Sequence, residues 1–417
     1  MMAQFRTREL GPEAAASGLQ SAISAAVVAA CVDAFGDHLR GIVLTGSLAR
    51  REATFVYDSV GWNALGDAEF FVVFAQRSAL PGAAQTESVR QEAERTLIGQ
   101  GICCHIDLSP VHPEYLRGLQ PHILAYELRE CGQVVWGDAG LLSLIPQFPA
   151  SAILLEDAWR LLCNRMVEYL AVAAGLLQPD CPLPPAVFYR TVKLYLDMAT
   201  SFLLFAGEYE PTYAGRAARL RGLAATPQPR MDLPFRLDAF ADRVAFCTAF
   251  KLRGPGYREE DAAAFQGEQA GVFWRDAIAY ARRLWRWELR RLTGSAQGLS
   301  DRELMRAWMR RQPLPLRLRG WVRVVRDSGW RCSWRAWPRW LMLAFQASPR
   351  YWVYAAATEI VFRLPNCRDL DAFNAASICE WLPLPPAPQV LGPVPRWAKA
   401  GLAVLSNYER FVAVTRA

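Results

Sequence analysis

The sequence predicts an α+β fold, in which a small mixed-sheet domain is followed by an all-helical domain and a further C-terminal helical region. Short apolar runs alternate with polar helical stretches up to about residue 150, which is typical of a small sheet domain with crossing helices. Beyond residue 150 the apolar residues recur at helical spacing. A length of 417 residues is too great for one ordinary core, so two or three domains are expected.

Residues 1–150 form the predicted sheet domain. An Ala-rich helix covers 12–36 and stops at Gly36. Dense Val, Ile and Phe mark the buried strands, and the stretch between the first two strands has no regular pattern. The predicted elements are strands over 41–47, 68–74, 102–111 and 133–138, an irregular loop within 48–66 after a helix start, and a polar helix within 81–101.

Two helical regions follow, over residues 151–298 and 299–417. The first has helical apolar repeats on both sides of a Pro-rich break, which favours a bundle. The second contains an Arg- and Trp-rich segment, 317–340, and a Pro-rich stretch. The predicted helices cover 152–177, 186–207, 237–252, 259–293, 301–311 and 397–414.

Composition indicates a globular protein and excludes few functions. The formal net charge of +7 comes almost entirely from arginine, which suits a mildly basic soluble protein as well as one with an acidic ligand. The ten cysteines include no CxxC pair, and the four histidines lack zinc-ligand spacing. Neither a signal peptide nor an uninterrupted apolar run of about 18 residues is present. A cytoplasmic location without a transmembrane helix is therefore predicted.

Three acidic residues occur where strand geometry can bring them together. Asp67 and Glu69 stand two apart at the start of one strand, so their side chains share a face. Asp107 lies within a neighbouring predicted strand and can complete a set of oxygen ligands. Hard cations such as Mg²⁺ prefer such ligands and relieve their mutual repulsion. Gly46 and Ser47 close another strand, where the backbone can approach a phosphate and a hydroxyl can donate to it.

The stretch VLTGSLARRE…LGDAEFFVVF…CHIDLSPV resembles the DNA polymerase β-type nucleotidyltransferase superfamily. Its pattern is an apolar strand ending in Gly-Ser, an Asp-x-Asp/Glu pair opening a second strand, and an acid within a third. Bacterial members often read GSxxRGE in the first element. The resemblance covers about residues 20–140, and extends over 150–215 by general architecture only.

That resemblance implies roles for single residues. Ser47 would hold the triphosphate together with Gly46, and Asp67 with Glu69 would bind two Mg²⁺ ions, with Mn²⁺ as an alternative metal. Asp107 would join the catalytic metal and act as the base. A lysine of the helical domain commonly contacts the phosphates in this superfamily, and Lys193 is the candidate, with an ordinary exposed helix residue as the alternative.

The sequence departs from the family pattern at several positions. Arg51 replaces the usual Gly, Gly66 stands where Ser is common, and the second acid is Glu69 rather than Asp. The gap between Gly46 and Asp67 is longer than usual and contains Tyr57 and Trp62, which are expected to contact an acceptor or to lie in a surface loop. Glu52 is expected to cap the helix after Ser47.

These features predict a metal-dependent enzyme that transfers a nucleoside monophosphate from a nucleoside triphosphate to an acceptor hydroxyl and releases pyrophosphate. A small-molecule or sugar acceptor is favoured over nucleic acid. The alternatives are a catalytically inactive protein of this fold that binds nucleotides or partners, and a synthase of signalling oligonucleotides. Segment 317–340 has three interpretations, namely a membrane-surface contact, nucleic-acid binding, or core packing with Arg stems over Trp rings.

Overall fold

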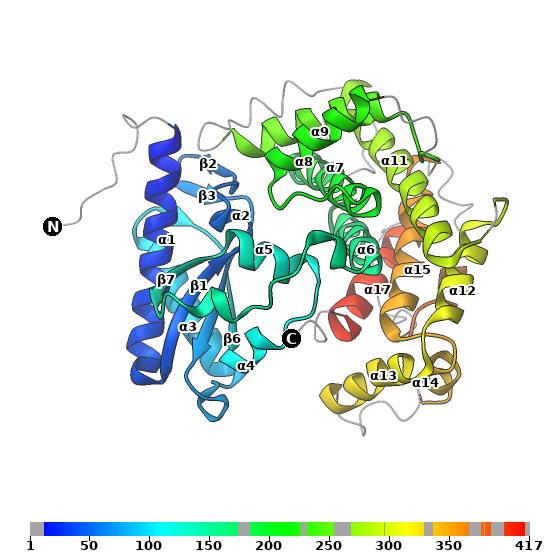
Figure 1. Cartoon of the computed structure of the whole chain (residues 1–417). Coiled ribbons are helices and arrows are strands. Elements are labelled where there is room, and N and C mark those ends of the chain that lie inside the picture. Colours follow the sequence, from blue (N-terminus) through cyan, green and yellow to red (C-terminus); the bar gives the residue numbers. More distant parts are fainter. Residues whose placement is uncertain are drawn as a thin grey trace. The chain divides into compact units, whose positions relative to one another are not determined.

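The computed structural model divides the chain into two compact units, and Figure 1 shows its ribbon. The first unit contains Met1–Asp157, Ala206–Thr226 and Ala241–Asp261, and the second contains Ala158–Phe205, Pro227–Phe240 and Ala262–Ala417. Strands occur only in the first unit within the described residues, so the predicted α+β class is confirmed. The described residues are 12–173, 184–226, 232–253, 268–295, 297–328, 337–366, 377–378, 380–384 and 396–412.

A mixed sheet with the strand order β6-β4-β1-β7 organises the first unit. β1 pairs antiparallel with β4 and β7, whereas β4 and β6 run parallel. Parallel neighbours need a crossover connection, and α3 lies in it. The bounds are β1 Leu39–Thr45, β4 Ala68–Phe74, α3 Ala83–Gly99, β6 Ile106–Val111 and β7 Gln133–Gly137.

Successive side chains of β4 point to opposite faces of the sheet, and both faces are buried. Phe70 and Val72 belong to a core that α1 (Pro12–Phe35) and α3 also build. Phe71 and Val73 point to the opposite face, where they join a second core with Ala125 of α5 (Ile123–Cys131). Both faces are covered, so β4 is apolar along nearly its whole length, as the sequence predicts for a buried strand.

Helix α1 packs against the sheet. Judged by length and composition alone, the segment Ala15–His38 could cross a membrane, although the sequence predicts no such helix. Ile23, Val27 and Cys31 of this helix are fully buried in the first core, at the i, i+4, i+8 spacing of one helix face. One face of the helix therefore packs into the core, and the cellular location stays a prediction.

The prediction of an irregular loop within 48–66 is wrong, because part of this stretch forms a hairpin. β2 (Phe55–Tyr57) and β3 (Trp62–Ala64) pair antiparallel, and β3 pairs in parallel with β5 (Ile102–Cys103) to form a second small sheet. Asp58 closes the hairpin turn by accepting hydrogen bonds from the backbone N–H groups of Val60 and Gly61. The single strand predicted over 102–111 is therefore two, because β5 and β6 pair in different sheets.

Short helices pack on the second face of the main sheet. α4 (Pro113–Arg117) contributes Leu116 and α5 contributes Leu128 to the core there. α8 (Tyr213–Ala225) also belongs to the first unit, although it comes from the region predicted to be a separate helical domain. None of these helices is among the elements that the sequence predicts.

The second unit is built from helices around a cluster of aromatic rings. Trp159 is fully buried, stacks on Tyr351 with ring centroids 5.8 Å apart, and meets Trp308 edge-on. Asn164 accepts hydrogen bonds from the hydroxyls of Tyr354 and Tyr408 and so links three helices. The helices of this unit are α6 Leu155–Ala173, α7 Pro185–Ala206, α11 Glu268–Thr293, α12 Asp301–Arg311, α13 Leu314–Ser328, α14 Trp337–Ala344, α15 Pro349–Val361 and α17 Arg396–Phe411 among the described residues. α6 begins and α7 ends in the first unit, and α9 (Leu237–Leu252) begins in the second unit and lies mostly in the first.

The tryptophans of the segment 317–340 that the structure describes serve the core. Trp321 and Trp340 are buried, their rings lie 5.8 Å apart, and both contact Phe411. Residues 329–336 of this segment lie outside the described residues. The core-packing interpretation therefore holds for these two tryptophans.

Candidate functional site

The sheet register places two of the three predicted acids, Glu69 and Asp107, on one face at one end of the sheet. Glu69 on β4 is the direct Cα partner of Asp107 on the parallel strand β6. Directly opposite residues on neighbouring strands point to the same face. Asp67 lies immediately before β4, two residues ahead of Glu69, and is exposed, as is Asp107. This face is the one that bears Phe71 further along β4.

The electrostatics of Glu69 show how crowded these charges are. Burial raises the pKa of Glu69, and the nearby carboxyls of Asp107 and Asp67 raise it further. The guanidinium of Arg50 opposes this shift without cancelling it. Charge repulsion among carboxylates of this kind is what a divalent cation would relieve.

Gly46 brings the end of β1 against the acids. Thr45 is the register partner of Glu69 on the antiparallel strand, and Gly46 follows it with a φ of +69°. The positive φ favours glycine here, and a Cβ at residue 46 would lie 2.6 Å from Oε2 of Glu69, so that this carboxylate would have to shift. Ser47 follows in the short helix α2 (Gly46–Ala49) and is half-buried. The predicted Gly-Ser bend therefore lies directly beside Glu69.

A buried network of ion pairs fixes the chain that leaves this bend. Arg50 bonds to Glu127 of α5 over 2.6 Å, and Glu127 also pairs with Arg216 of α8 and accepts from the hydroxyl of Tyr209. Burial alone would raise the pKa of Glu127, but the two guanidinium groups outweigh it and lower this pKa. This network is not predictable from the sequence alone, although Arg50 stands where the family pattern GSxxRGE has its Arg.

The sequence predicts that Glu52 caps the helix after Ser47, and this prediction is wrong. Its carboxylate instead accepts the backbone N–H of Tyr213 over 2.7 Å, at the first turn of α8, and its other oxygen pairs with Arg50. An anionic side chain at a helix N-terminus satisfies N–H groups that have no partner within the helix. The motif Arg and Glu are thus joined to α8, far along the chain.

Arg51, which replaces the usual Gly, occupies a left-handed backbone conformation with a φ of 59°. Replacing Arg51 by Gly is expected to stabilise the protein by about 0.5–1 kcal/mol, because this conformation strains a side-chain-bearing residue more than it does glycine. Urea unfolding measures the change. Arg51→Ala keeps a Cβ and serves as the control, so an equal gain in that variant would contradict the backbone explanation.

Glu69→Gln is expected to raise the melting temperature at neutral pH. The folded protein keeps the Glu69 proton at pH values where the unfolded chain has lost it, so this carboxyl makes the protein less stable as the pH rises above its ordinary pKa. Glutamine stays neutral, and its advantage should therefore vanish at acidic pH and grow toward neutrality. Thermal unfolding from about pH 4 to about pH 8 tests this. The exposed Glu92, replaced by Gln, is the control, and a gain that does not change with pH would argue against titration of Glu69.

An open groove of about 430 Å³ lies beside Asp107 in the first unit. Its walls come from β6 and from the first half of α3, where Thr86, Glu87 and Arg90 supply polar groups and Leu108 an apolar one. The size is within the range of small-molecule sites. Asp107 is therefore both the strand partner of Glu69 and part of the wall of a space that a small molecule can enter.

Two parts of the predicted site are not assembled by these contacts. Among the described residues, no three His, Cys, Asp or Glu side chains are placed so that they could hold a metal ion. Glu69 and Asp107 share a face without forming a closed ligand set with Asp67, and metal binding stays a prediction. Lys193 lies on α7 in the second unit, where its ammonium is 5.4 Å from the centre of the Tyr189 ring, and its contact with phosphates also stays a prediction.

Comparison with known proteins does not assign this chain to a family. No family model matches the chain, and no curated protein resembles it significantly.

Proposed function

We propose that this protein is a metal-dependent nucleotidyltransferase, which moves a nucleoside monophosphate from a nucleoside triphosphate to an acceptor hydroxyl. The observation that carries the proposal is the pairing of Glu69 with Asp107 across β4 and β6, beside the Gly46 bend. Acids from separate strands on one face, next to a turn that admits a phosphate, are the arrangement that the resemblance implies. The raised pKa of Glu69 supports a site suited to a divalent cation.

The chain's own residues supply the remaining chemistry. Asp67, Glu69 and Asp107 would hold Mg²⁺, which when bound offsets the charge of the triphosphate and of the attacking and leaving oxygens. Ser47 would donate a hydrogen bond to a phosphate oxygen, and Gly46 permits its close approach. Asp107 accepts the proton of the acceptor hydroxyl as that oxygen bonds to the α-phosphorus. The bond from the α-phosphorus to the bridging oxygen breaks, and pyrophosphate leaves with the electron pair.

The groove beside Asp107 favours a small acceptor. Its lining combines the polar side chains of Thr86, Glu87 and Arg90 with the apolar Leu108, a mixture suited to a hydroxyl-bearing small molecule or sugar. An acceptor in this groove would place its hydroxyl near the base that the proposal names.

Turnover can be tested directly with the full chain. Each of the four nucleoside triphosphates is titrated calorimetrically with Mg²⁺ present, and pyrophosphate release is then followed with sugars and other small hydroxyl compounds as acceptors. The proposal expects Mg²⁺-dependent binding of at least one nucleotide and pyrophosphate release that requires an acceptor. Absence of both for all four nucleotides would overturn it.

A second candidate function is an inactive nucleotide-binding module of the same fold. It is favoured by the absence of a closed set of three metal ligands among the described residues and by the packing of Glu69 against Gly46. Nucleotide binding without pyrophosphate release would identify this module.

A further inference from the structure

Exposed apolar side chains gather on two neighbouring helices of the second unit, α13 and α14. Leu314, Leu318 and Val322 of α13 are all exposed, Val322 to 65%. Leu341 and Met342 of α14 are exposed as well, and Phe345 directly after it is 65% exposed. Large apolar groups in contact with water are unfavourable unless something covers them.

Spacing puts these side chains in rows. Leu314, Leu318 and Val322 follow one another at i, i+4 and i+8, so they form one stripe along α13. Leu341 and Phe345 are likewise four residues apart. The two helices are joined by the guanidinium of Arg317, which donates to the carbonyl of Phe345 over 2.5 Å, and by the ring contact of Trp321 with Trp340.

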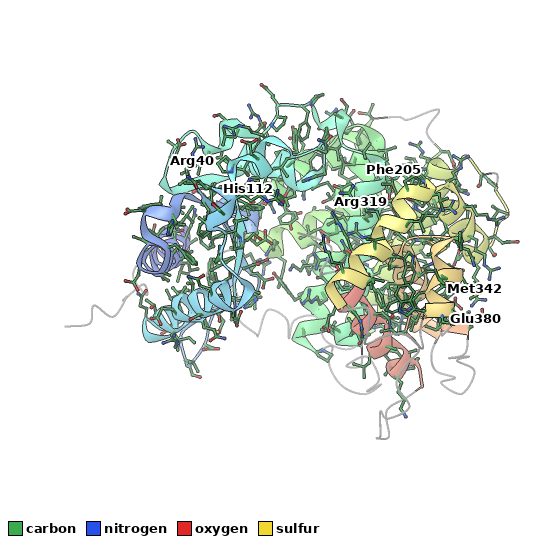
Figure 2. The ribbon with its side chains drawn as sticks, turned by 90° about the horizontal axis from the view of Figure 1, so that it is seen from below. Arg40, His112, Phe205, Arg319, Met342 and Glu380 are labelled. Atoms are coloured by element: carbon green, nitrogen blue, oxygen red, sulfur yellow. The ribbon has the colours of Figure 1, made fainter. Side chains whose placement is uncertain are left out.

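Arginines flank the apolar stripe of α13. Arg319, Arg323 and Arg326 are spaced for a second row on the same helix. Figure 2 looks at the end of the second unit where α13 and α14 lie, and it labels Arg319 and Met342. The helices therefore carry a basic row beside an apolar one.

A cavity of about 290 Å³ adjoins this basic row. Arg319 and Arg323 line it together with Arg160 of α6 and Arg350 at the start of α15. Its described lining residues include no Asp or Glu. Four guanidinium groups around one cavity favour an anionic ligand with several oxygens, such as a phosphate group.

We propose that α13 and α14 dock the protein on an anionic phospholipid surface. The apolar stripes enter the boundary between headgroups and acyl chains, while Arg319 and Arg326 contact lipid phosphates and the cavity receives one phosphate headgroup. An amphipathic helix with arginines beside its apolar face is the pattern of interfacial binding. Single-stranded nucleic acid would call for several exposed aromatic platforms, whereas Trp321 and Trp340 are buried and the exposed ring of Phe345 lies in the apolar row with Leu341.

Co-sedimentation of the full chain with vesicles tests the proposal. Vesicles of phosphatidylcholine alone are compared with vesicles that also contain phosphatidylglycerol, at low and high salt. Binding is expected only with phosphatidylglycerol and should weaken as salt increases. Equal binding to both kinds of vesicle, or binding to neither, would overturn the proposal.

Two double variants separate the contributions of the two rows. Arg319→Glu with Arg326→Glu should weaken partitioning by at least about 25-fold, since each basic side chain contributes about fivefold near an anionic surface. Val322→Asp with Phe345→Asp should abolish binding. The controls are Arg283→Glu on α11 and Ile98→Asp on α3, which are also exposed. Circular dichroism verifies that each variant is folded, and an equal loss in the controls would refute the docking surface.

Two further measurements distinguish a lipid surface from two other occupants, a soluble phosphate compound and a second copy of this chain. Inorganic phosphate is added in a thermal unfolding assay, and stabilisation by phosphate without vesicle binding would reassign the cavity to a soluble phosphate compound. Gel filtration reports the oligomeric state. A dimer that Phe345→Asp dissociates, again without vesicle binding, would reassign the apolar stripes to self-association.

Discussion

Asp107→Asn is expected to lower the rate of pyrophosphate release by about 10²–10⁴-fold, because asparagine cannot accept the proton of the attacking hydroxyl. The change is nearly isosteric and lies at an exposed position, so the fold should be retained. Asp67→Asn should abolish both Mg²⁺ binding and turnover, since it removes a ligand proposed for both ions. Pyrophosphate release with saturating nucleotide, together with calorimetric Mg²⁺ titration, measures both effects.

The matched control is Asp37→Asn in the first unit. Asp37 is an exposed carboxylate just before β1, whereas the acids lie at the other end of that strand, about 20 Å away at the usual rise per residue. Its replacement should leave the rate unchanged. If Asp107→Asn released pyrophosphate at the rate of the unaltered protein, the catalytic assignment of this residue would be wrong.

Glu127→Ala is expected to destabilise the first unit by about 3–5 kcal/mol, because it leaves two buried guanidinium groups without their shared carboxylate. The side chains of Arg50 and Arg216 are only 6% and 4% exposed, so water cannot replace the lost partner. Since Arg50 follows the Gly46 bend, the variant should also disorder the segment that carries Ser47. Urea unfolding, followed by the circular dichroism of the whole chain, measures the loss.

Glu130→Ala provides the control on the same helix. Glu130 is exposed on α5, and its replacement should change stability by less than about 0.5 kcal/mol. A loss of similar size in both variants would show that helix α5, rather than the buried ion pairs, is sensitive to substitution.

The strands that bear the acids were predictable because their signal is local. The dense Phe and Val residues of β4 predicted the strand from neighbours along the chain, whereas the shared face of Asp67 and Glu69 stays a prediction because Asp67 lies just before the strand. The hairpin after Ser47 was not predicted. Its strands are three residues long, and β3 is held partly by β5, a pairing that no local pattern reveals.

The buried ion pairs illustrate a second limit of the sequence. Arg50 and Glu127 lie 77 residues apart, and Arg216 lies 89 residues beyond Glu127. Charged residues usually face water, so the residue types alone predict exposed positions for Arg50, Glu127 and Arg216 and not a shared buried network. The same limit applies to the second unit, where the sequence left three interpretations of 317–340 open and the structure buries Trp321 and Trp340 while exposing Leu, Val, Met and Phe on and directly after α13 and α14.

By itself the sequence determined the α+β class and the main strands of the first unit, because these depend on neighbours along the chain. Only the tertiary structure decided that Asp107 is the partner of Glu69, that Gly46 closes against that carboxylate, and that Arg50 is anchored to α5 and α8. Those contacts join residues that are distant in the chain, and strand register and packing alone bring them together.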